Sequence, residues 1–273
     1  MDGATWCAAA NLTHPEAVID VHRAYLAAGA EIITANTYAT SPLLFSALDR
    51  SDEVGEIDRV AVALAREAAG PDIQVAGSFS VMRLVGAGTD RTRLDVGLAE
   101  REAKRLLRAK ADGLAEAGVD FILMEMMRDA DYSLWATEAA VATGLPVWLG
   151  VAAERADNGT LIGFGRPDMP LHDIVGPLCD TGVEQVSVMH TAINDIDAAL
   201  DVVRRVWRGP VGVYPESGYF AMPDWQFVDI IGPDDLVQHS RTWVAGGVTL
   251  VGGCCGIGPE HIEALAREHG HHG

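Results

Sequence analysis

Short apolar runs and longer amphipathic stretches alternate along almost the whole chain. The apolar runs, which predict buried strands, are Ala30–Thr34, Ile73–Gly77, Val119–Met124, Leu145–Val151, Val186–Met189, Pro210–Tyr214 and Val248–Val251. The amphipathic stretches, which predict helices, are Pro15–Ala28, Glu53–Ala69, Leu94–Ala117, Ala130–Thr143, Leu171–Thr181, Asp195–Trp207 and Pro233–Ala245. Several of these helices end at a glycine just before the next strand, which is the usual C-cap position. Apolar strands that alternate with helices predict a parallel sheet covered by helices.

The even spacing of these units favours a closed barrel over an open sheet. The chain has 273 residues, the size of one (β/α)₈ TIM-type barrel, and contains no linker or low-complexity segment. We therefore expect one barrel domain over residues 1–268, followed by a short tail over 269–273. In such a barrel the site lies at the C-terminal ends of the strands.

Charge and composition exclude several classes of partner. The formal net charge of −19 argues against nucleic acid and against anionic membrane surfaces. No apolar run is long enough to span a bilayer, and no basic and apolar leader opens the sequence. Four cysteines without small-domain spacing indicate free thiols, so we expect a cytoplasmic protein. The oligomeric state is left open.

Two adjacent cysteines stand in a glycine-rich turn near the C-terminus. Cys254 and Cys255 follow the predicted strand Val248–Val251 and precede a helix that starts near Pro259 and runs to about His269. A thiol pair in such a turn can bind a soft metal such as zinc, and the glycines let a ligand approach the backbone closely. The alternative is that the two thiols are small apolar fillers between strand and helix.

Polar residues collect at the ends of the other predicted strands. They are Asn36, Thr37, Ser78, Glu125, His190, Tyr214, Glu216 and Ser217. Together with the cysteine pair, His190 makes three ligands, the number that a catalytic zinc takes from protein. Three alternatives remain open: a hydrogen-bonded structural His190, an ion pair between Glu125 and Arg128, and a turn role for Asn36.

These residues resemble the zinc-dependent homocysteine S-methyltransferases. The resemblance covers nearly the whole chain and includes His22–Ala30, Ala35–Tyr38, Ala76–Ser78, the Gly118-Val119-Asp120 segment leading to Glu125, and Val213–Gly218. Its most specific motif is Gly252-Gly253-Cys254-Cys255-Gly256. The resemblance implies a (β/α)₈ barrel and methyl transfer from a sulfonium, ammonium or folate donor to a thiol bound on zinc.

The resemblance also implies roles for individual residues. Cys254 and Cys255 match two zinc ligands of the family, and Glu125 matches the acid that holds the amino group of homocysteine. Asn36 and Thr37 match residues that line the amino-acid pocket. We accordingly expect metal ligation by His190, Cys254 and Cys255, catalytic roles for Glu125 and Tyr214, and substrate binding by Asn36, Thr37, Ser78, Glu125, Glu216 and Ser217.

The sequence departs from the family pattern in three places. Met189-His190 stands where the family has asparagine and its third cysteine ligand, and Glu216 stands where the family has asparagine. When Trp6 is aligned with the family's later tryptophan, the first strand is absent, so we expect a barrel that lacks or alters that strand. Of the family's two acids that bind the substrate ammonium group, only Glu125 is clearly matched here. Either Glu216 substitutes for the second acid, or the substrate is another thiol.

The favoured function is a zinc-dependent S-methyltransferase that moves a methyl group from a sulfonium or ammonium donor to a thiol such as homocysteine. A barrel that uses its metal as a Lewis acid or water activator, hence a lyase or hydrolase, is the alternative. A paralogue that binds metal or thiol without turnover is the third hypothesis.

Overall fold

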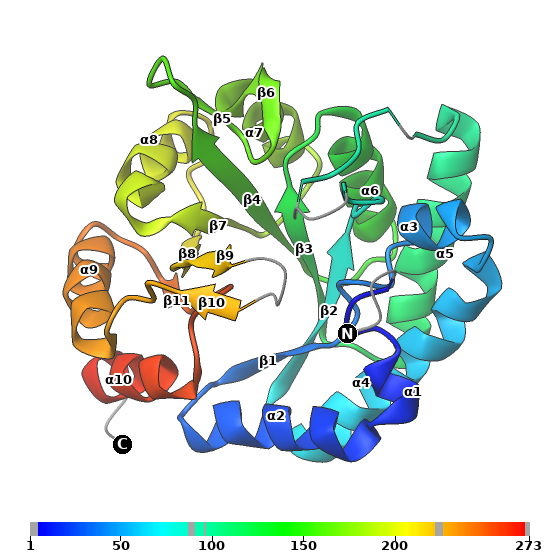
Figure 1. The fold of residues 1–273 in the computed structure, drawn as a ribbon, viewed down its shortest axis with the longest axis horizontal. Coiled ribbons are helices and arrows are strands. Elements are labelled where there is room, and N and C mark those ends of the chain that lie inside the picture. The colour runs from blue at the N-terminus through cyan, green and yellow to red at the C-terminus, as the bar shows by residue number, and fades with distance from the viewer. Residues whose placement is uncertain (1–4, 87–90, 96, 222–225, 271–273) are drawn as a thin grey trace.

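The computed structural model describes residues 5–86, 91–95, 97–221 and 226–270. Its centre is a parallel sheet in the order β1-β2-β3-β4-β7-β8-β11. The strands are β1 (Ile32–Ala35), β2 (Gln74–Ser80), β3 (Phe121–Met127), β4 (Val147–Arg155), β7 (Gln185–Ala192), β8 (Val211–Glu216) and β11 (Leu250–Val251). The sheet curls as in a TIM barrel, with helices around the outside (Figure 1). The predicted fold class is confirmed.

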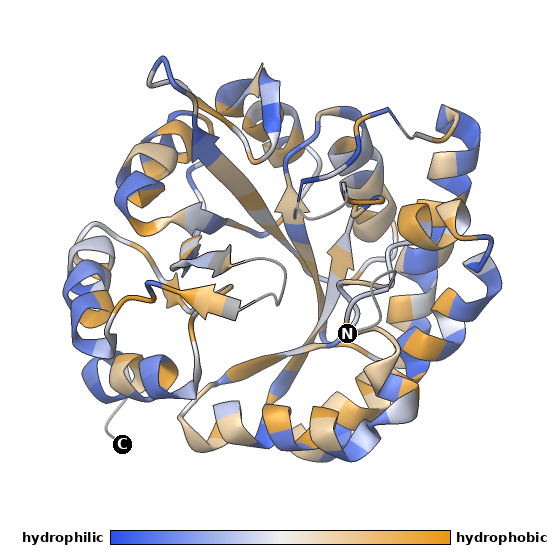
Figure 2. Ribbon diagram, in the orientation of Figure 1, coloured by the Kyte–Doolittle hydropathy of each residue, from blue (hydrophilic) through white to orange (hydrophobic). Residues whose placement is uncertain are grey.

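An outer ring of helices covers the convex face of the sheet. Its members are α1 (Ala10–Thr13), α2 (Pro15–Ala27), α3 (Pro42–Ala47), α4 (Val54–Ala69), α5 (Glu100–Ala117), α6 (Asp131–Val141), α7 (Leu171–Cys179), α8 (Ile196–Val206), α9 (Pro233–Ala245) and α10 (Pro259–His269), with 3₁₀ turns at η1 (Ser51–Glu53) and η2 (Ile193–Asp195). Polar residues mark the outward faces of several of these helices (Figure 2). Amphipathic helices of this kind cover a sheet on one side and meet water on the other.

The curled sheet does not close. Within the described ranges, no strand pairing joins β11 to β1, which are the two shortest of the parallel strands. The ends of the sheet are bridged by helices instead. The Tyr25 hydroxyl on α2 donates to the carbonyl of Ile257, 3.0 Å away, and Gly29 lies so close to Ala266 of α10 that a Cβ would be 2.7 Å from its methyl carbon. Over the described residues the sheet is therefore an open barrel of seven parallel strands, in agreement with the expected change at the first strand.

Alternation along the strands separates two apolar layers. Residues such as Val186 and Val188 face outward and pack with the helices in the main core. Residues such as Phe121, Leu123 and Met189 face the barrel interior and form a second cluster with Tyr214. The interior cluster extends up to the mouth, where Phe164 belongs to it and Cys254 packs against it.

A buried ion pair anchors the segment that follows β1. Lys110 Nζ of α5 lies 2.7 Å from each carboxylate oxygen of Asp58 of α4, and both side chains are at most 2 % exposed. The same ammonium donates to the Thr40 hydroxyl and to the carbonyl of Thr37. Burial lowers the pKa of Lys110 and raises that of Asp58, and the contact between the two groups opposes both shifts. The pair thus fixes the loop that leaves the first strand.

The predicted helix over Leu94–Ala117 begins late, at Glu100. Leu98 is held in the preceding segment because its N–H donates to the Tyr132 hydroxyl (2.9 Å) and its carbonyl accepts from the same hydroxyl (3.2 Å). Ala99 then has an extended backbone, with ψ of 142°. Tertiary hydrogen bonds therefore override a helical pattern here.

Several short elements were not predicted. They are α1, α3 and two additions at the mouth: β5 (Leu161–Gly163) with β6 (Arg166–Pro170), and β9 (Tyr219–Ala221) with β10 (Gln226–Val228). The predicted domain range 1–268 stays a prediction, although α10 continues to His269, whose Nε2 lies 2.8 Å from the Ser240 hydroxyl. No helix among the described residues has both the length and the apolar character needed to cross a bilayer.

Candidate metal centre

The two adjacent cysteines lie in the turn between β11 and α10, as predicted. The turn is tied to the end of β8, because Cys254 N–H donates to the carbonyl of Pro215 and the Cys255 carbonyl accepts from Ser217 N–H, both at 2.9 Å. Gly256 has φ of +79°, and a Cβ there would collide with the backbone of Ser217. Only glycine is compatible with this close approach, so the turn places both thiols at the barrel mouth.

A bulge in β7 aims His190 at the same place. Simple alternation would send this side chain outward with Val186 and Val188. The pairing of β7 with β8 instead shifts between Met189 and Ala192, so that β7 contains one extra residue, and His190 has φ of +41°. Bulges commonly redirect a side chain in this way beside functional sites. The His190 ring consequently lies at the mouth, with the residue 7 % exposed.

His190, Cys254 and Cys255 form one compact group. Their ligand atoms all lie within 4.8 Å of one another. The two Sγ atoms are 3.9 Å apart, and Cys254 Sγ is 3.4 Å from His190 Nδ1. Tetrahedral zinc with ordinary bond lengths requires about 3.8 Å between two sulfurs and about 3.6 Å between sulfur and nitrogen. The three side chains therefore fit a zinc ion by donor chemistry and by spacing, with a fourth position left for a substrate.

The electrostatics of the group favour a cation. Sharing a proton with Cys255, together with burial, raises the pKa of Cys254 far above its usual range. Burial lowers the pKa of His190, but its hydrogen bond to Cys255 and the nearby charges of Cys255 and Glu216 outweigh burial and raise the pKa overall. Both pKa values are raised, which is the direction that neighbouring negative charge produces, and a divalent cation bound among these groups would offset that charge.

Glu125 lies at the same mouth, at the end of β3. Its carboxylate accepts a short hydrogen bond from the Ser78 hydroxyl, and Thr37 Oγ1 donates to the carbonyl of Ser78 at 2.8 Å. Burial raises the pKa of Glu125 to about 7. Among the described residues no ion pair joins Glu125 to Arg128, whose guanidinium bonds the Phe164 carbonyl at 3.3 Å. Glu125 is therefore a half-buried acid for which the described residues form no ion pair with a lysine or arginine, as a site for a substrate ammonium group requires.

Tyr214 projects from β8 into the barrel interior. Its hydroxyl is buried and has no hydrogen-bond partner among the described residues, and burial raises its pKa well above the usual value. A Cβ on Gly150 of β4 would collide with this hydroxyl, so the glycine makes room for the ring. The charges of Glu125 and Cys254 also raise the pKa of Tyr214, which places its hydroxyl close to the candidate site.

Two predicted substrate-binding residues bond to other parts of the chain. Asn36 donates to the Cys7 carbonyl and to the Asn11 side chain, and accepts from Cys7 Sγ. The Ser217 hydroxyl accepts from Ile231 N–H at 2.7 Å and thereby holds the segment after β10. All six predicted substrate contacts, including Thr37, Ser78, Glu125 and Glu216, stay predictions.

Phe164 was not predicted as a site residue. Its ring stands edge-on to the His190 imidazole, with centroids 4.7 Å apart, and its other neighbours are the guanidinium groups of Arg91 and Arg128. The Gly163-Phe164-Gly165 sequence was the available signal, because a Cβ on Gly163 would meet the Arg128 carbonyl at 2.5 Å. Phe164 lies in the turn between β5 and β6, two strands that the sequence did not predict.

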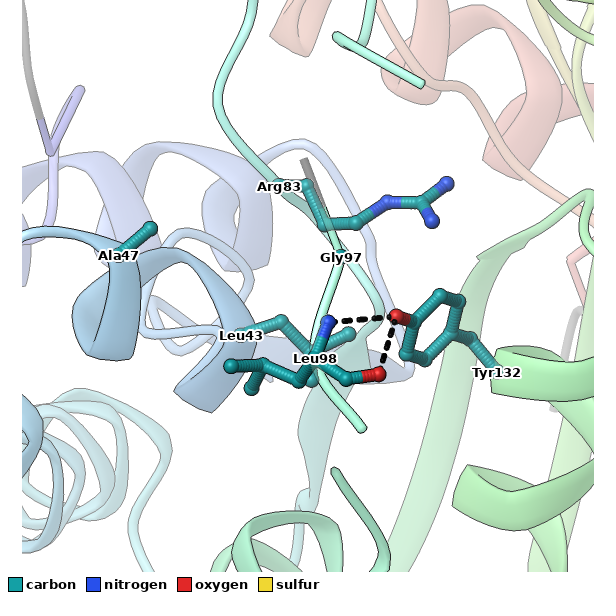
Figure 3. Close-up of a pocket in the computed structure, with 6 residues that line it drawn as sticks. All are labelled: Leu43, Ala47, Arg83, Gly97, Leu98 and Tyr132. Atoms are coloured by element: carbon teal, nitrogen blue, oxygen red, sulfur yellow. Dashed lines mark hydrogen bonds between the residues drawn. The ribbon is translucent and has the colours of Figure 1, made fainter. Parts of the chain in front are cut away.

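A small cavity lies outside the sheet and away from the cysteine pair. It has a volume of about 100 Å³ and is lined by Leu43, Ala47, Arg83, Gly97, Leu98 and Tyr132 (Figure 3). The Tyr132 hydroxyl points at the Leu98 backbone and is bonded to it (Figure 3). None of the predicted site residues lines this cavity, so we place the candidate functional site at the barrel mouth.

The fold and the three-residue group together define a parallel α/β barrel with a candidate thiol–imidazole metal site at the C-terminal ends of its strands. Comparison with known proteins identifies the family. A sequence model of homocysteine S-methyltransferases matches residues 1–269, and the chain belongs to this family. The resemblance found in the sequence is thereby confirmed.

Individual relatives agree with this assignment. Betaine–homocysteine S-methyltransferase 1 of Danio rerio is 27 % identical over 96 % of this chain and 67 % of its own length. S-methylmethionine–homocysteine S-methyltransferase of Pongo abelii is 26 % identical over 96 % of this chain and 72 % of its own. The chain thus spans about two thirds of these relatives. Metallated homocysteine methyltransferase MmuM of Escherichia coli shares the fold, with a TM-score of 0.76, 24 % identity and coverage of 98 % of this chain and 89 % of that one.

Proposed function

We propose that this chain is a zinc-dependent S-methyltransferase that moves a methyl group from a sulfonium or ammonium donor to the thiol of an amino acid such as homocysteine. The observation that carries the proposal is the location of His190, Cys254 and Cys255 near the half-buried acid Glu125 at one barrel mouth. His190, Cys254 and Cys255, with a bound metal, suit a thiol, and Glu125 suits an ammonium group. Homocysteine contains both groups within one small molecule.

The metal, when bound, would hold the acceptor sulfur as a thiolate at neutral pH. His190, Cys254 and Cys255 would hold the metal, and Glu125 would bind the substrate ammonium group, with Ser78 and Thr37 fixing the carboxylate. As the bond from the acceptor sulfur to the methyl carbon forms, the bond from that carbon to the donor's sulfur or nitrogen breaks, and its electron pair stays on the donor. The chain's contribution is alignment of the two reactants.

Two other hypotheses make different predictions for the same assay. A lyase or hydrolase would consume a substrate without any methyl donor, and a non-catalytic paralogue would bind metal and thiol without forming product. The family to which the chain belongs supports the methyltransferase.

The test combines metal analysis with product detection. The purified chain, loaded with zinc, is incubated with homocysteine and each of several sulfonium, ammonium and folate donors, and methionine is measured by mass spectrometry. We expect about one zinc per chain and methionine from a sulfonium or ammonium donor. Cys254→Ala should lose both zinc and product. Full zinc occupancy in Cys254→Ala, or no methylated thiol with any donor, would overturn the proposal.

A further inference from the structure

The two ring nitrogens of His190 have different neighbours. Nδ1 lies 3.4 Å from Cys254 Sγ, on the side of the thiol pair. Nε2 lies 3.1 Å from Oε2 of Glu216, on the opposite side of the ring. The side chains are 9 % and 21 % exposed, respectively, so the contact between them is shielded from water. One imidazole therefore links the candidate metal site to a carboxylate.

The backbone holds both partners in place. Glu216 follows the ordinary alternation of β8 and points inward, as Tyr214 does, whereas His190 depends on the bulge in β7. The Thr191 hydroxyl supports this bulge, because it donates to the Met189 carbonyl at 2.9 Å and accepts from Ala153 N–H at 3.0 Å. The residue paired with Glu216 across the two strands is Ala192, directly beyond the bulge. The bulge is thus what brings the imidazole beside this carboxylate.

Phe164 restricts the His190 ring further. Its ring meets the imidazole edge-on, at an interplanar angle of 71°. Glu216 lies at Nε2, and the cysteines lie at Nδ1. A flip of the imidazole would therefore place Nδ1 beside the carboxylate and Nε2 beside the two sulfurs. A carboxylate is the better hydrogen-bond acceptor.

We propose that Glu216 is a positioning residue that accepts the Nε2–H of His190 and so presents Nδ1 to the metal. Neutral imidazole has one N–H, and a carboxylate that takes it leaves the lone pair of the other nitrogen free for a metal. Carboxylates that bond a metal-ligating histidine in this way orient the ring and raise its basicity. A cysteine at position 190 would have no second nitrogen to orient. Glu216 and His190 therefore act as a unit, and the proposal rests on the metal site of the proposed function.

The first test is metal affinity, measured by competition with a chromophoric chelator in the absence of any methyl donor. Loss of such a carboxylate commonly weakens metal binding by about 10- to 100-fold. We expect this loss for Glu216→Ala. A smaller loss is expected for Glu216→Gln, which keeps an acceptor without the charge. Unfolding of the metal-free variants is followed in parallel, and unchanged metal affinity in folded Glu216→Ala would overturn the proposal.

A double-mutant cycle separates orientation of His190 from a general effect of negative charge. In a His190→Cys background, Glu216→Ala should change zinc affinity by less than about 3-fold, because the orienting role depends on the imidazole. An equal loss in both backgrounds would mean that Glu216 acts only as a nearby charge. Glu260→Ala is the matched control, because the Glu260 carboxylate lies 3.4 Å from Nδ1 of His261, a histidine outside the ligand group. This control should leave zinc affinity unchanged.

Nitrogen-15 NMR of the zinc-loaded protein gives a readout that does not depend on any variant. We expect the His190 signals of a metal-bound Nδ1 and a protonated Nε2. A metal-bound Nε2 would overturn the assignment. Because both experiments omit the methyl donor, they distinguish failure of this inference from failure of the proposed transfer reaction, which product analysis tests separately.

Discussion

Replacing Glu125 by glutamine should stabilise the metal-free protein at alkaline pH while weakening substrate binding. Burial raises the pKa of this carboxyl from 4.5 to about 7. A pKa that is higher in the folded state contributes stability below pH 4.5, and this contribution is lost as the pH rises through 7. At 1.36 kcal/mol per pKa unit, the ionised carboxylate costs roughly 3 kcal/mol of folding free energy by pH 8.5, but under about 1 kcal/mol at pH 5. Glutamine removes this dependence and can still accept from Ser78 Oγ.

The assay is unfolding of the reduced, metal-free protein at both pH values. At about 2–4 °C per kcal/mol for a chain of this size, Glu125→Gln should gain roughly 5–10 °C relative to the parent between pH 5 and pH 8.5. Glu31→Gln, at an exposed position just before β1, is the control and should show no such gain. The same Glu125→Gln variant should raise the KM for homocysteine with zinc content unchanged. An equal difference between variant and parent at both pH values would refute the reasoning.

Two further outcomes follow from buried polar groups. Lys110→Met should lower the unfolding free energy by about 3–5 kcal/mol in chemical denaturation, because it leaves the Asp58 carboxylate buried without its cation. The double variant Lys110→Met with Asp58→Leu should recover much of this loss. A double variant as unstable as Lys110→Met alone would contradict the explanation. Tyr214→Phe removes a buried hydroxyl that has no hydrogen-bond partner among the described residues, so the unfolding free energy should change by under about 1 kcal/mol. If this hydroxyl acts in the reaction, kcat should fall in the same variant. An unchanged kcat would argue against the predicted catalytic role of Tyr214.

The sequence predicted the order of the barrel units because each strand is short, apolar and bounded by glycine. Helices α9 and α10 begin and end as expected, since Pro233 and Pro259 mark their first turns. The last strand was predicted less well. The run Val248–Val251 contains only two residues with strand pairing, because β11 pairs with β8 alone among the described strands.

The candidate site shows where local patterns stop being informative. The glycine-rich turn around Cys254 indicated a metal ligand directly, since its chemistry and its backbone requirement are adjacent in sequence. Reading His190 as a strand-end residue brought it into the predicted site, but simple alternation would have pointed it at the helices. The bulge that redirects it depends on Thr191 bonding across to β4, a contact between residues 38 positions apart. Phe164 reaches the site through a loop, so no strand pattern could place it.

The open sheet has a consequence for how the chain folds. Every parallel pairing described joins strands that follow one another along the sequence, from β1 to β11, apart from the small hairpins β5–β6 and β9–β10 inserted after β4 and β8. Pairing each strand with the next therefore requires closing a loop of only tens of residues. The larger entropy cost of bringing the two ends of the chain together is not part of sheet formation. Such a sheet can grow in the order of synthesis, with contact of α10 against α2 as the final docking step.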